Sequence, residues 1–415
     1  MGTISTDKNV ISFTGDFGES DLQVATAAIY QITNKLYYKD IVLDFSKISK
    51  AIAPDFLPLC ANVRSILHDG IDTQFIEPDD IKLRRLFRNA GWSHLLDPVS
   101  FAESDFAGKI HSPAAIYRTG EEQHKAVDNI IDILLGSLEG VTRSQIAALE
   151  WSINEITDNV LNHAESSIGG IVQVTSRRGG KMVEFVVCDY GLGIPRTLRS
   201  THSEITSDID ALDRAIREGI TRNTATNMGN GLYGSYRMAQ LSGGQFKIQS
   251  GYATLKYDPK IGMHIRQNKV PFHGTLVSCS IDCSDQSILE EALVFRGKIY
   301  KPSYTYFDKI DDLEKVTIKL LDESNAFGTR EIAKPVRLKI ENVLRNSDTF
   351  IDIDMDGVEL ISSSFADEVF GKLFYALGPL NFTQRVRIVN GSRVVSQLID
   401  RAISQRMALR PGEVV

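Results

Sequence analysis

The chain has 415 residues, of which 42% are hydrophobic and 24% are charged. This composition is typical of a globular protein, and the length exceeds that of one ordinary hydrophobic core, so we expect two or three domains. The formal net charge of -7 argues against a general affinity for nucleic acid, which is bound mainly through an excess of Lys and Arg. Because no membrane-spanning run and no signal peptide is evident, we expect a cytoplasmic protein.

The first segment, residues 1–105, alternates between strand and helix patterns. Strands are predicted at VISFTG, IVLDFSKI and DTQFIEP. Helices are predicted at DLQVATAAIYQITNKL, PDFLPLCANVRSIL and DIKLRRLFRNAGWSHLL. Strict alternation of this kind indicates a small open sheet backed by helices.

The middle segment, residues 120–285, has a different order. Apolar periodicity is lost in FAGKIHSPAAIYRTGEEQ, and helices are then predicted at HKAVDNIIDILLGSL and SQIAALEWSINEITDNVLNHAE. Two strands form an apparent hairpin around Arg177–Gly180. A polar stretch from Arg196 to Asn230, with one predicted helix near Ile209–Glu218, precedes the helix SYRMAQLSGG and strands at QFKIQSG, ATLKY, MHIRQ and GTLVSCSI.

The last segment, residues 312–410, repeats the alternation of the first. Strands are predicted at VTIKLLDE, FIDIDMDGVELI and RVRIVN, and helices at AKPVRLKIENVL, FADEVFGKLFYAL and RVVSQLIDRAI. The repeat indicates two similar modules around a central one.

The four cysteines offer little chemistry. Cys60 and Cys188 lie in apolar runs and are expected to be buried. Cys279 and Cys283 could supply half of a metal site, but no second Cys or His pair with suitable spacing follows. We therefore expect all four to be structural.

The first of four candidate motifs is Glu155-x-x-x-Asn159, within a long amphipathic helix. Residues four apart lie on neighbouring turns of one helix face, so both side chains can point into one cleft. A carboxylate can deprotonate an attacking hydroxyl, and an amide oxygen is a suitable ligand for Mg²⁺. Taken alone, such a pair is more often part of a solvated face.

The second motif is Asp189-Tyr-Gly191-Leu-Gly193, which follows the apolar strand MVEFVVC. A carboxylate at the end of a buried strand needs a partner, and an exocyclic amine of adenine would supply one. Glycines allow the backbone to pass close to a flat ring. The alternative is an ordinary turn after a strand.

The third motif, Gly229-Asn-Gly231-Leu232-Tyr-Gly234, precedes a predicted helix. Glycine-rich backbone at a helix amino terminus gathers free N–H groups and suits phosphates. A dinucleotide-binding fold is rejected because the preceding TRNTATNM is polar and not a strand. A P-loop is excluded because its sequence pattern does not occur. The fourth motif is Gly274-Thr275, whose hydroxyl could bind a base or a water held with Asp189.

In this order, the four motifs resemble the ATP-binding domain of the GHKL superfamily (the Bergerat fold), which includes DNA gyrase, heat-shock chaperone ATPases, histidine kinases and MutL. The resemblance covers roughly Val141–Ile281, and INEITDNVLNHA is most similar to the anti-sigma-factor serine kinases. It implies ATP and Mg²⁺ as cofactors, Asn159 as the metal ligand, Glu155 as the general base and Asp189 as the reader of adenine. The remaining implied nucleotide-binding positions are Gly191, Gly193, Gly229, Gly231, Leu232, Gly234 and Thr275, with Arg196–Met228 as a mobile lid.

The two flanking segments resemble STAS domains, the fold of anti-sigma-factor antagonists. In the first segment the resemblance rests on IVLDFSKI, AIAPDFLPL and KLRRLFRNAGWSHLL, and in the last on GTREIAKPVRLKIE, DGVELISSSFADEVF and VNGSRVVSQLIDRAI. Antagonist STAS domains carry a phosphorylated serine between a strand and a helix, and Ser363 fits that position. The first segment has Ala53 and Pro54 there. The alternative is that these serines cap the helix, with Ser364 as the N-cap candidate.

Together these patterns predict an α/β and α+β multidomain protein, with a central α/β sandwich of the Bergerat type between two small STAS-like βα modules. The favoured function is a regulatory switch whose nucleotide state controls how these modules contact a protein partner of the STAS or sigma-regulatory type, with slow ATP hydrolysis or serine phosphorylation. An ATP-driven clamp of the gyrase or MutL kind and a non-catalytic nucleotide-binding scaffold are alternatives. No membrane or nucleic-acid partner is expected, and the resemblance leaves a homodimer open.

Overall fold

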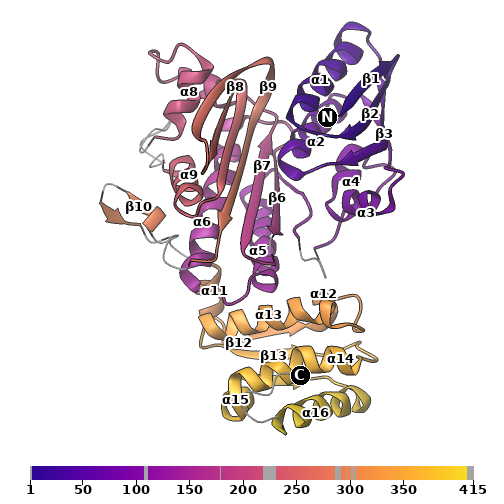
Figure 1. Ribbon diagram of the computed structural model, residues 1–415, viewed down its shortest axis with the longest axis vertical. Coiled ribbons are helices and arrows are strands. Elements are labelled where there is room, and N and C mark those ends of the chain that lie inside the picture. The colour runs from indigo at the N-terminus through magenta and orange to yellow at the C-terminus, as the bar shows by residue number, and fades with distance from the viewer. Residues whose placement is uncertain are drawn as a thin grey trace.

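The computed structural model describes residues 2–106, 111–177, 179–217, 230–285, 291–295, 297–300, 302 and 305–408. It is a mixed α/β multidomain structure in which three main sheets follow one another along the chain (Figure 1). We refer to residues 2–106 as the N-terminal module, 111–285 as the central module and 305–408 as the C-terminal module.

The N-terminal module contains a four-stranded sheet in the order β1-β2-β3-β4. Its elements are β1 (Thr3–Asp7), β2 (Val10–Asp16), α1 (Glu19–Tyr30), η1 (Gln31–Lys35), β3 (Asp40–Lys50), α2 (Ala53–His68), β4 (Asp72–Ile76), α3 (Ile81–Asn89) and α4 (Trp92–Leu96). Strands β2, β3 and β4 are parallel, as expected from the alternation, and β1 pairs antiparallel to β2. One predicted helix is divided into α3 and α4 because Gly91 adopts a left-handed conformation between them.

The central module contains a five-stranded sheet in the order β5-β6-β7-β9-β8. Its elements are β5 (Ala115–Tyr117), α5 (Gly120–Ser137), α6 (Arg143–Asn159), η2 (Val160–Ala164), β6 (Gly170–Arg177), β7 (Met182–Asp189), α7 (Ile194–Arg199), α8 (Asp208–Ala215), α9 (Gly231–Leu241), β8 (Gln245–Asp258) and β9 (Gly262–Asp282). The predicted hairpin is β6–β7.

Three sequence predictions for the central module were wrong in detail. The four strands expected after α9 are two long antiparallel strands, β8 and β9, that bend at a bulge near Gly251. The polar stretch after β7 holds two helices, α7 and α8, where one was expected. The segment without apolar periodicity contributes β5, a short edge strand whose few residues are too short to show a pattern.

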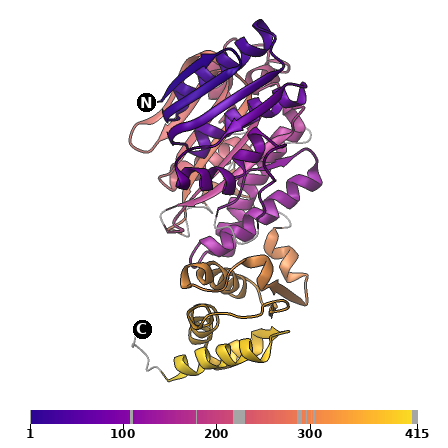
Figure 2. The same cartoon turned by 90° about the vertical axis from the view of Figure 1, so that its right-hand side faces the viewer.

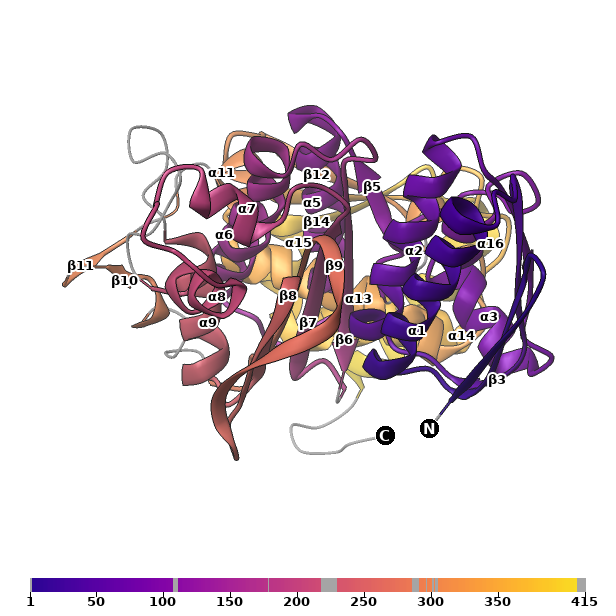
Figure 3. The same cartoon turned by 90° about the horizontal axis from the view of Figure 1, so that it is seen from above.

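The two faces of the central sheet are covered by different parts of the chain. Successive side chains of a strand point to opposite faces, and on β7 Val187 packs with the core of α5 and α6 whereas Val186 and Cys188 pack with α1 and α2. Figure 3 shows α1 and α2 between the N-terminal sheet and the central sheet. Cys60 and Cys188 are buried, as predicted, at this junction.

The C-terminal module contains a three-stranded parallel sheet in the order β12-β13-β14. A small hairpin, β10 (Val294–Phe295) and β11 (Lys298–Ile299), precedes the module, which begins with α11 (Tyr306–Asp311). Its elements are β12 (Lys315–Lys319), α12 (Leu320–Glu323), α13 (Arg330–Asn346), β13 (Phe350–Asp354), α14 (Ser363–Ala366), η3 (Asp367–Gly371), α15 (Lys372–Arg385), β14 (Val386–Val389) and α16 (Arg393–Met407).

Helix α13 joins the C-terminal module to α5 of the central module (Figure 2). The Asn342 side-chain amide donates to the carbonyl oxygens of Leu135 and Leu138 at 2.8 and 2.7 Å. Arg143 at the start of α6 forms ion pairs with Asp308 and Asp311 of α11. None of the helices in the described part of the chain has the length and apolar character needed to cross a membrane.

Candidate functional site

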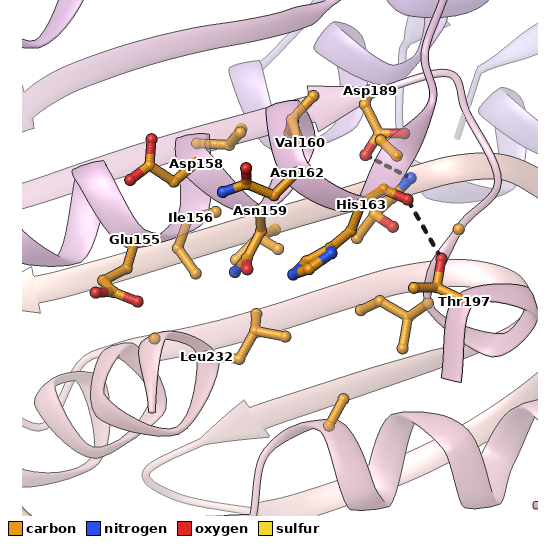
Figure 4. Close-up of a pocket in the computed structure, with 18 of the residues that line it drawn as sticks. Glu155, Ile156, Asp158, Asn159, Val160, Asn162, His163, Asp189, Thr197 and Leu232 are labelled. Atoms are coloured by element: carbon orange, nitrogen blue, oxygen red, sulfur yellow. Dashed lines mark hydrogen bonds between the residues drawn. The ribbon is translucent and has the colours of Figure 1, made fainter. Parts of the chain in front are cut away.

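The carboxyl-terminal end of α6 lines a cavity together with β7, β9, α7 and the start of α9 (Figure 4). Helix α6 ends in the π-helical turn η2, a feature that often occurs at functional sites. The cavity brings together Glu155, Asn159, Asp189, Gly193, Gly231, Leu232 and Thr275 from all four predicted motifs. Residues that the motifs did not include also line it, among them Asp158, Asn162, His163 and Thr197.

Asp189 lies at one end of this cavity and is almost completely buried. Its Oδ1 accepts a hydrogen bond from the backbone N–H of Gly191 at 2.9 Å, and its Oδ2 accepts one from Thr275 at 3.1 Å. Burial raises the pKa of this carboxyl to about 7, against the lowering effect of the two N–H donors. The second and fourth motifs are thereby joined through one carboxylate.

A glycine at position 274 is required for the close approach of the Gly274–Thr275 backbone to Asp189. It has a φ of +90°, and a Cβ atom there would lie 2.6 Å from Oδ1 of Asp189 and would also collide with the Asp189 carbonyl oxygen. Any larger residue at position 274 would displace either the Asp189 carboxylate or the part of β9 that begins at Thr275. In the motif Gly274-Thr275 a role was predicted only for the threonine hydroxyl, and the need for a glycine at position 274 becomes evident in the fold.

Ser250 is a buried residue of β8 that belongs to none of the four motifs. Its hydroxyl donates to the carbonyl oxygen of Gly274 at 2.7 Å and accepts from the backbone N–H of Ile194 at 2.9 Å. It also lies 3.4 Å from the Thr275 hydroxyl. Ser250 thus connects the Gly193 turn to the Gly274–Thr275 turn. The signal in the sequence is the dipeptide Ser250–Gly251 inside a strand, which is typical of a bulge.

Glu155 lies at the other end of the cavity, beside the start of α9 (Figure 4). Burial, with a further contribution from the nearby Asp158 carboxylate, raises the pKa of Glu155 to about 7. A Cβ atom on Gly231 would lie 2.8 Å from both Cβ and Oε2 of Glu155. The first and third motifs are therefore in contact through a glycine, and Glu155 has the proton affinity of a general base at neutral pH.

Asn159 lies between Glu155 and Asp189 along the cavity (Figure 4). Within the part of the chain that the structure describes, its side-chain amide has no hydrogen-bond partner. The same part contains no group of three or more His, Cys, Asp or Glu side chains that could hold a metal ion. Asn159 fits a cation that takes one protein ligand and completes its coordination with ligand oxygens and water, as Mg²⁺ does.

Only part of the glycine-rich motif lines the cavity. Gly231 and Leu232, at the start of α9, line the cavity. Gly234 is buried one turn further along and is not among the lining residues, and its N–H donates to the Asn230 carbonyl oxygen at 2.7 Å. Gly191 likewise contributes its backbone N–H to Asp189 rather than lining the cavity. Gly229 lies outside the described residues.

The described part of the polar insert packs over the cavity. Helices α7 and α8 share a small apolar cluster of Leu198, Ile205, Ala211 and Ala215, against which Leu232 of α9 packs. Asp208 of α8 accepts from Arg199 at 2.5 Å and from the backbone N–H of Tyr252 at 2.7 Å. The part of the predicted lid from 218 to 228 lies outside the described residues.

The arrangement has a distinct chemistry at each end. At the Asp189 end, a buried carboxyl whose pKa is about 7 can accept a hydrogen bond from a donor group of a flat ring. Val187, Ile194 and Val277 provide apolar walls around it. The amide of Asn159, the start of α9 and the Glu155 carboxyl lie toward the opposite end. The cavity therefore suits an elongated ligand with a polar, hydrogen-bonding ring at one end and anionic groups at the other.

One protein-family model matches the chain, that of a STAS-like domain of unknown function (DUF4325), over residues 333–395. This range runs from α13 to the first turn of α16 and contains Ser363. It agrees with the expectation of a STAS-like C-terminal module. A comparison with curated proteins finds no match to the chain.

Proposed function

We propose that the central module binds Mg-ATP in this cavity, as a nucleotide site of the GHKL type. The observation that carries the proposal is the convergence of four separated motifs on one cavity, with Asp189 held by backbone N–H groups of Gly191 and Thr275. The ionised carboxylate retains lone pairs that can accept the exocyclic amine of adenine. A purine would lie against the apolar walls at this end.

The phosphates would lie toward Asn159 and the start of α9. Asn159 would hold Mg²⁺, which would neutralise charge on the phosphate oxygens. The backbone at Gly231 begins an 11-residue helix, whose amino-terminal dipole end favours negative charge. Gly231 has no side chain, so the phosphates can approach this backbone.

Glu155 would act on the terminal phosphate. Its carboxylate would take the proton from a water or a serine hydroxyl as that oxygen forms a bond to phosphorus and the bond to the ADP oxygen breaks. The products would be ADP with either inorganic phosphate or a phosphoserine. A pKa of about 7 gives a mixture of ionised and protonated Glu155 at neutral pH, so turnover is expected to be slow and to rise with pH up to about 8.

The position of Ser363 limits the ways in which this serine could accept the terminal phosphate. The C-terminal module contacts α6 through Arg143 and, from Tyr306, through Glu150. Helix α14, which begins at Ser363, lies on the far side of α13 from the central module (Figure 1), whereas Glu155 and Asn159 lie near the last turn of the 17-residue helix α6. A helix of this length spans roughly 25 Å. Ser363 of the same molecule therefore does not reach the terminal phosphate in this arrangement, and transfer to it would require a second copy of the chain.

Two connections would let the nucleotide state influence the flanking modules. On β7, Val187 lines the cavity and its neighbours Val186 and Cys188 pack with α1 and α2 of the N-terminal module. Helix α6 runs from the cavity to Arg143 at the C-terminal module. We therefore favour a regulatory ATP-binding protein, acting on a protein partner through a STAS-like module. The gyrase-type clamp is less favoured because a STAS-like match follows the central module.

Incubation of the purified protein with Mg²⁺ and terminally labelled ATP tests the proposal. Release of labelled phosphate that is lost in Glu155→Ala would support an ATPase. Label retained on the protein and lost in Ser363→Ala would support a kinase acting between copies. Saturable ATP binding without either signal would favour a nucleotide-binding scaffold. Absence of ATP binding would refute the proposal for all three.

A further inference from the structure

A second cavity, of about 410 Å³, lies in the C-terminal module between the starts of α13 and α14 and the last half of α16. It is separate from the nucleotide cavity and shares no residue with it. Its polar lining is dominated by three arginines, Arg330 of α13 and Arg401 and Arg406 of α16. The remaining lining residues are Ser363, Ser364, Asp367, Leu398, Ala402 and Gln405.

Asp367 fixes two of these arginines. Arg406 donates from Nε and Nη2 to the two carboxylate oxygens at 2.7 and 2.8 Å, and Arg330 lies 3.0 Å from Oδ2. Bidentate pairing restricts the guanidinium orientation. These contacts lower the pKa of Asp367, chiefly through the hydrogen bond from Arg406, so the carboxylate stays ionised. The arginines are thus held in place before any ligand arrives.

Gly371 permits this packing. A Cβ atom there would lie 2.9 Å from Asp367 Oδ1, 3.2 Å from Arg406 Cγ and 3.3 Å from the Ala402 carbonyl oxygen. A larger residue at this position would separate α16 from η3 and move Arg406 away from its carboxylate. The close approach of the two helices therefore belongs to the construction of the cavity.

Arg401, unlike Arg330 and Arg406, is not held by Asp367. Among the residues that the structure describes, it has no ion-pair or hydrogen-bond partner, although it lines the same cavity. The lining thus contains three arginines and one carboxylate, which leaves a formal excess of two positive charges. Cations gathered in this way repel one another, and a bound anion would offset that repulsion.

From this geometry we infer that the cavity binds the phosphoryl group of a phosphomonoester, with Arg401 as its main free donor. A phosphoryl dianion carries the two negative charges that the lining lacks, and guanidinium forks match its oxygens. For a free phosphate-bearing molecule, the hydroxyls of Ser363 and Ser364 would supply further donors; for a phosphorylated Ser363, only that of Ser364 remains. The phosphoryl group could belong to a free small molecule or to a phosphorylated Ser363. The second source alone rests on the proposed function.

The binding test uses the full chain and inorganic phosphate as the probe, titrated by calorimetry at constant ionic strength. Saturable binding is expected, and Arg401→Gln should weaken it roughly tenfold through loss of one charge-assisted donor. The matched control is Arg393→Gln, since Arg393 is an exposed arginine on the same helix and does not line the cavity. Its affinity should equal that of the wild type.

A second control locates the site. Asn159→Ala alters the proposed phosphate end of the nucleotide cavity, so unchanged phosphate binding in that variant would place the site in the C-terminal module. Absence of saturable binding, or equal affinity in the wild type and Arg401→Gln, would overturn the inference whether or not ATP binds elsewhere. Because Arg401 is exposed and has no partner within the described part of the chain, thermal unfolding of this variant should match that of the wild type.

Phosphopeptide mapping together with the phosphate titration then separates the two sources. Protein that was incubated with Mg-ATP, carries phosphate on Ser363 and no longer binds added phosphate would assign the site to the chain's own phosphoserine. Unmodified protein that nevertheless binds phosphate in the titration would assign it to a free phosphate-bearing molecule. Both results presuppose the Arg401-dependent binding described above.

Discussion

The N-terminal and C-terminal modules share an order of parallel strands and intervening helices, yet they expose different surfaces. In one, β2, β3 and β4 alternate with α1 and α2; in the other, β12, β13 and β14 alternate with α13 and the helix begun by α14. The start of α2 is buried at Ala53 and Pro54, beside the pairing of Asp55 with Lys247 of the central sheet. The start of α14 is exposed at Ser363 beside a basic cavity.

Two modules with the same order of parallel strands and helices therefore have different surroundings: one packs inside the molecule, and the other leaves its helix starts exposed. The N-terminal module uses its helix face to cover the central sheet, so that face is not free for another protein. The C-terminal module attaches through α13 and leaves the starts of α14 and α16 accessible. We therefore expect a regulatory partner or modification to act on the C-terminal module.

The largest difference in stability is expected when a carboxylate is introduced at the start of α2 in one variant and at the start of α14 in another. Ala53→Asp introduces an unpaired carboxylate at a buried position and should lower the free energy of unfolding by on the order of 3 kcal/mol. Ser363→Asp, at the corresponding exposed position, should change it by less than about 0.5 kcal/mol. Urea denaturation of both variants measures the difference, and similar losses in the two would contradict the comparison.

The junction of the N-terminal module with the central sheet should also depend on Glu19 of α1. This half-buried carboxylate contacts Lys247, Lys256 and Arg266 of β8 and β9. Glu19→Gln leaves the three cations without their shared carboxylate and should cost about 2 kcal/mol of unfolding free energy. Lys47→Gln, which removes an ion pair that is exposed at both ends, is the matched control and should cost almost nothing.

The pH dependence of the Glu19 contribution has a definite sign. Burial acts to raise the pKa of Glu19, but the charge of Lys247, the hydrogen bond and charge of Lys256 and the charge of Arg266 together lower this pKa in the folded protein. The stabilisation is therefore complete above the pKa of the unfolded chain, about 4.3, and is lost as the pH falls through the lower folded value. The difference between wild type and Glu19→Gln should shrink in acid below that range. A difference that grew in acid would exclude this account.

A smaller effect is expected at the exposed helix start. The predicted cap was Ser364, but the structure shows Ser362 as the N-cap of α14, accepting from the backbone N–H of Phe365 at 3.0 Å and donating to the Gly328 carbonyl oxygen at 2.9 Å. Ser362→Ala should cost about 1 kcal/mol, and Ser364→Ala less than about 0.5 kcal/mol. Thermal unfolding of the two alanine variants distinguishes them, and the reverse order would restore the original prediction.

The sequence was most informative where a segment carries a periodic apolar face. Strand β3, with Ile41, Leu43 and Phe45 buried on one side, and helix α6 were both predicted for that reason. Strand β1 was missed because TISTD is polar and exposed, and is held only by pairing with β2. Local patterns also cannot show which face of the central sheet the N-terminal module covers, since that depends on contacts between distant segments.

At the candidate site, too, local sequence patterns do not show contacts between distant segments. The residue types of Glu155, Asn159 and Asp189 indicated a site because their chemistry is recognisable in short motifs. Ser250, which joins two turns of the cavity, carries no such motif and acts through hydrogen bonds to residues 24 and 56 positions away in the chain. The basic cavity of the C-terminal module could not be predicted either, because Arg330 and Arg406 meet only through the fold around Asp367.

If the cavity around Asp189 binds ATP, the Asp189→Asn variant should have a lower affinity for Mg-ATP than the wild type. The amide places an NH₂ group against the N–H of Gly191 or Thr275 and removes the carboxylate that would accept the adenine amine. We predict at least a roughly tenfold loss of affinity relative to the wild type, measured by calorimetry on a variant whose unfolding transition remains cooperative. Equal affinity for Mg-ATP in the two proteins would contradict the assignment.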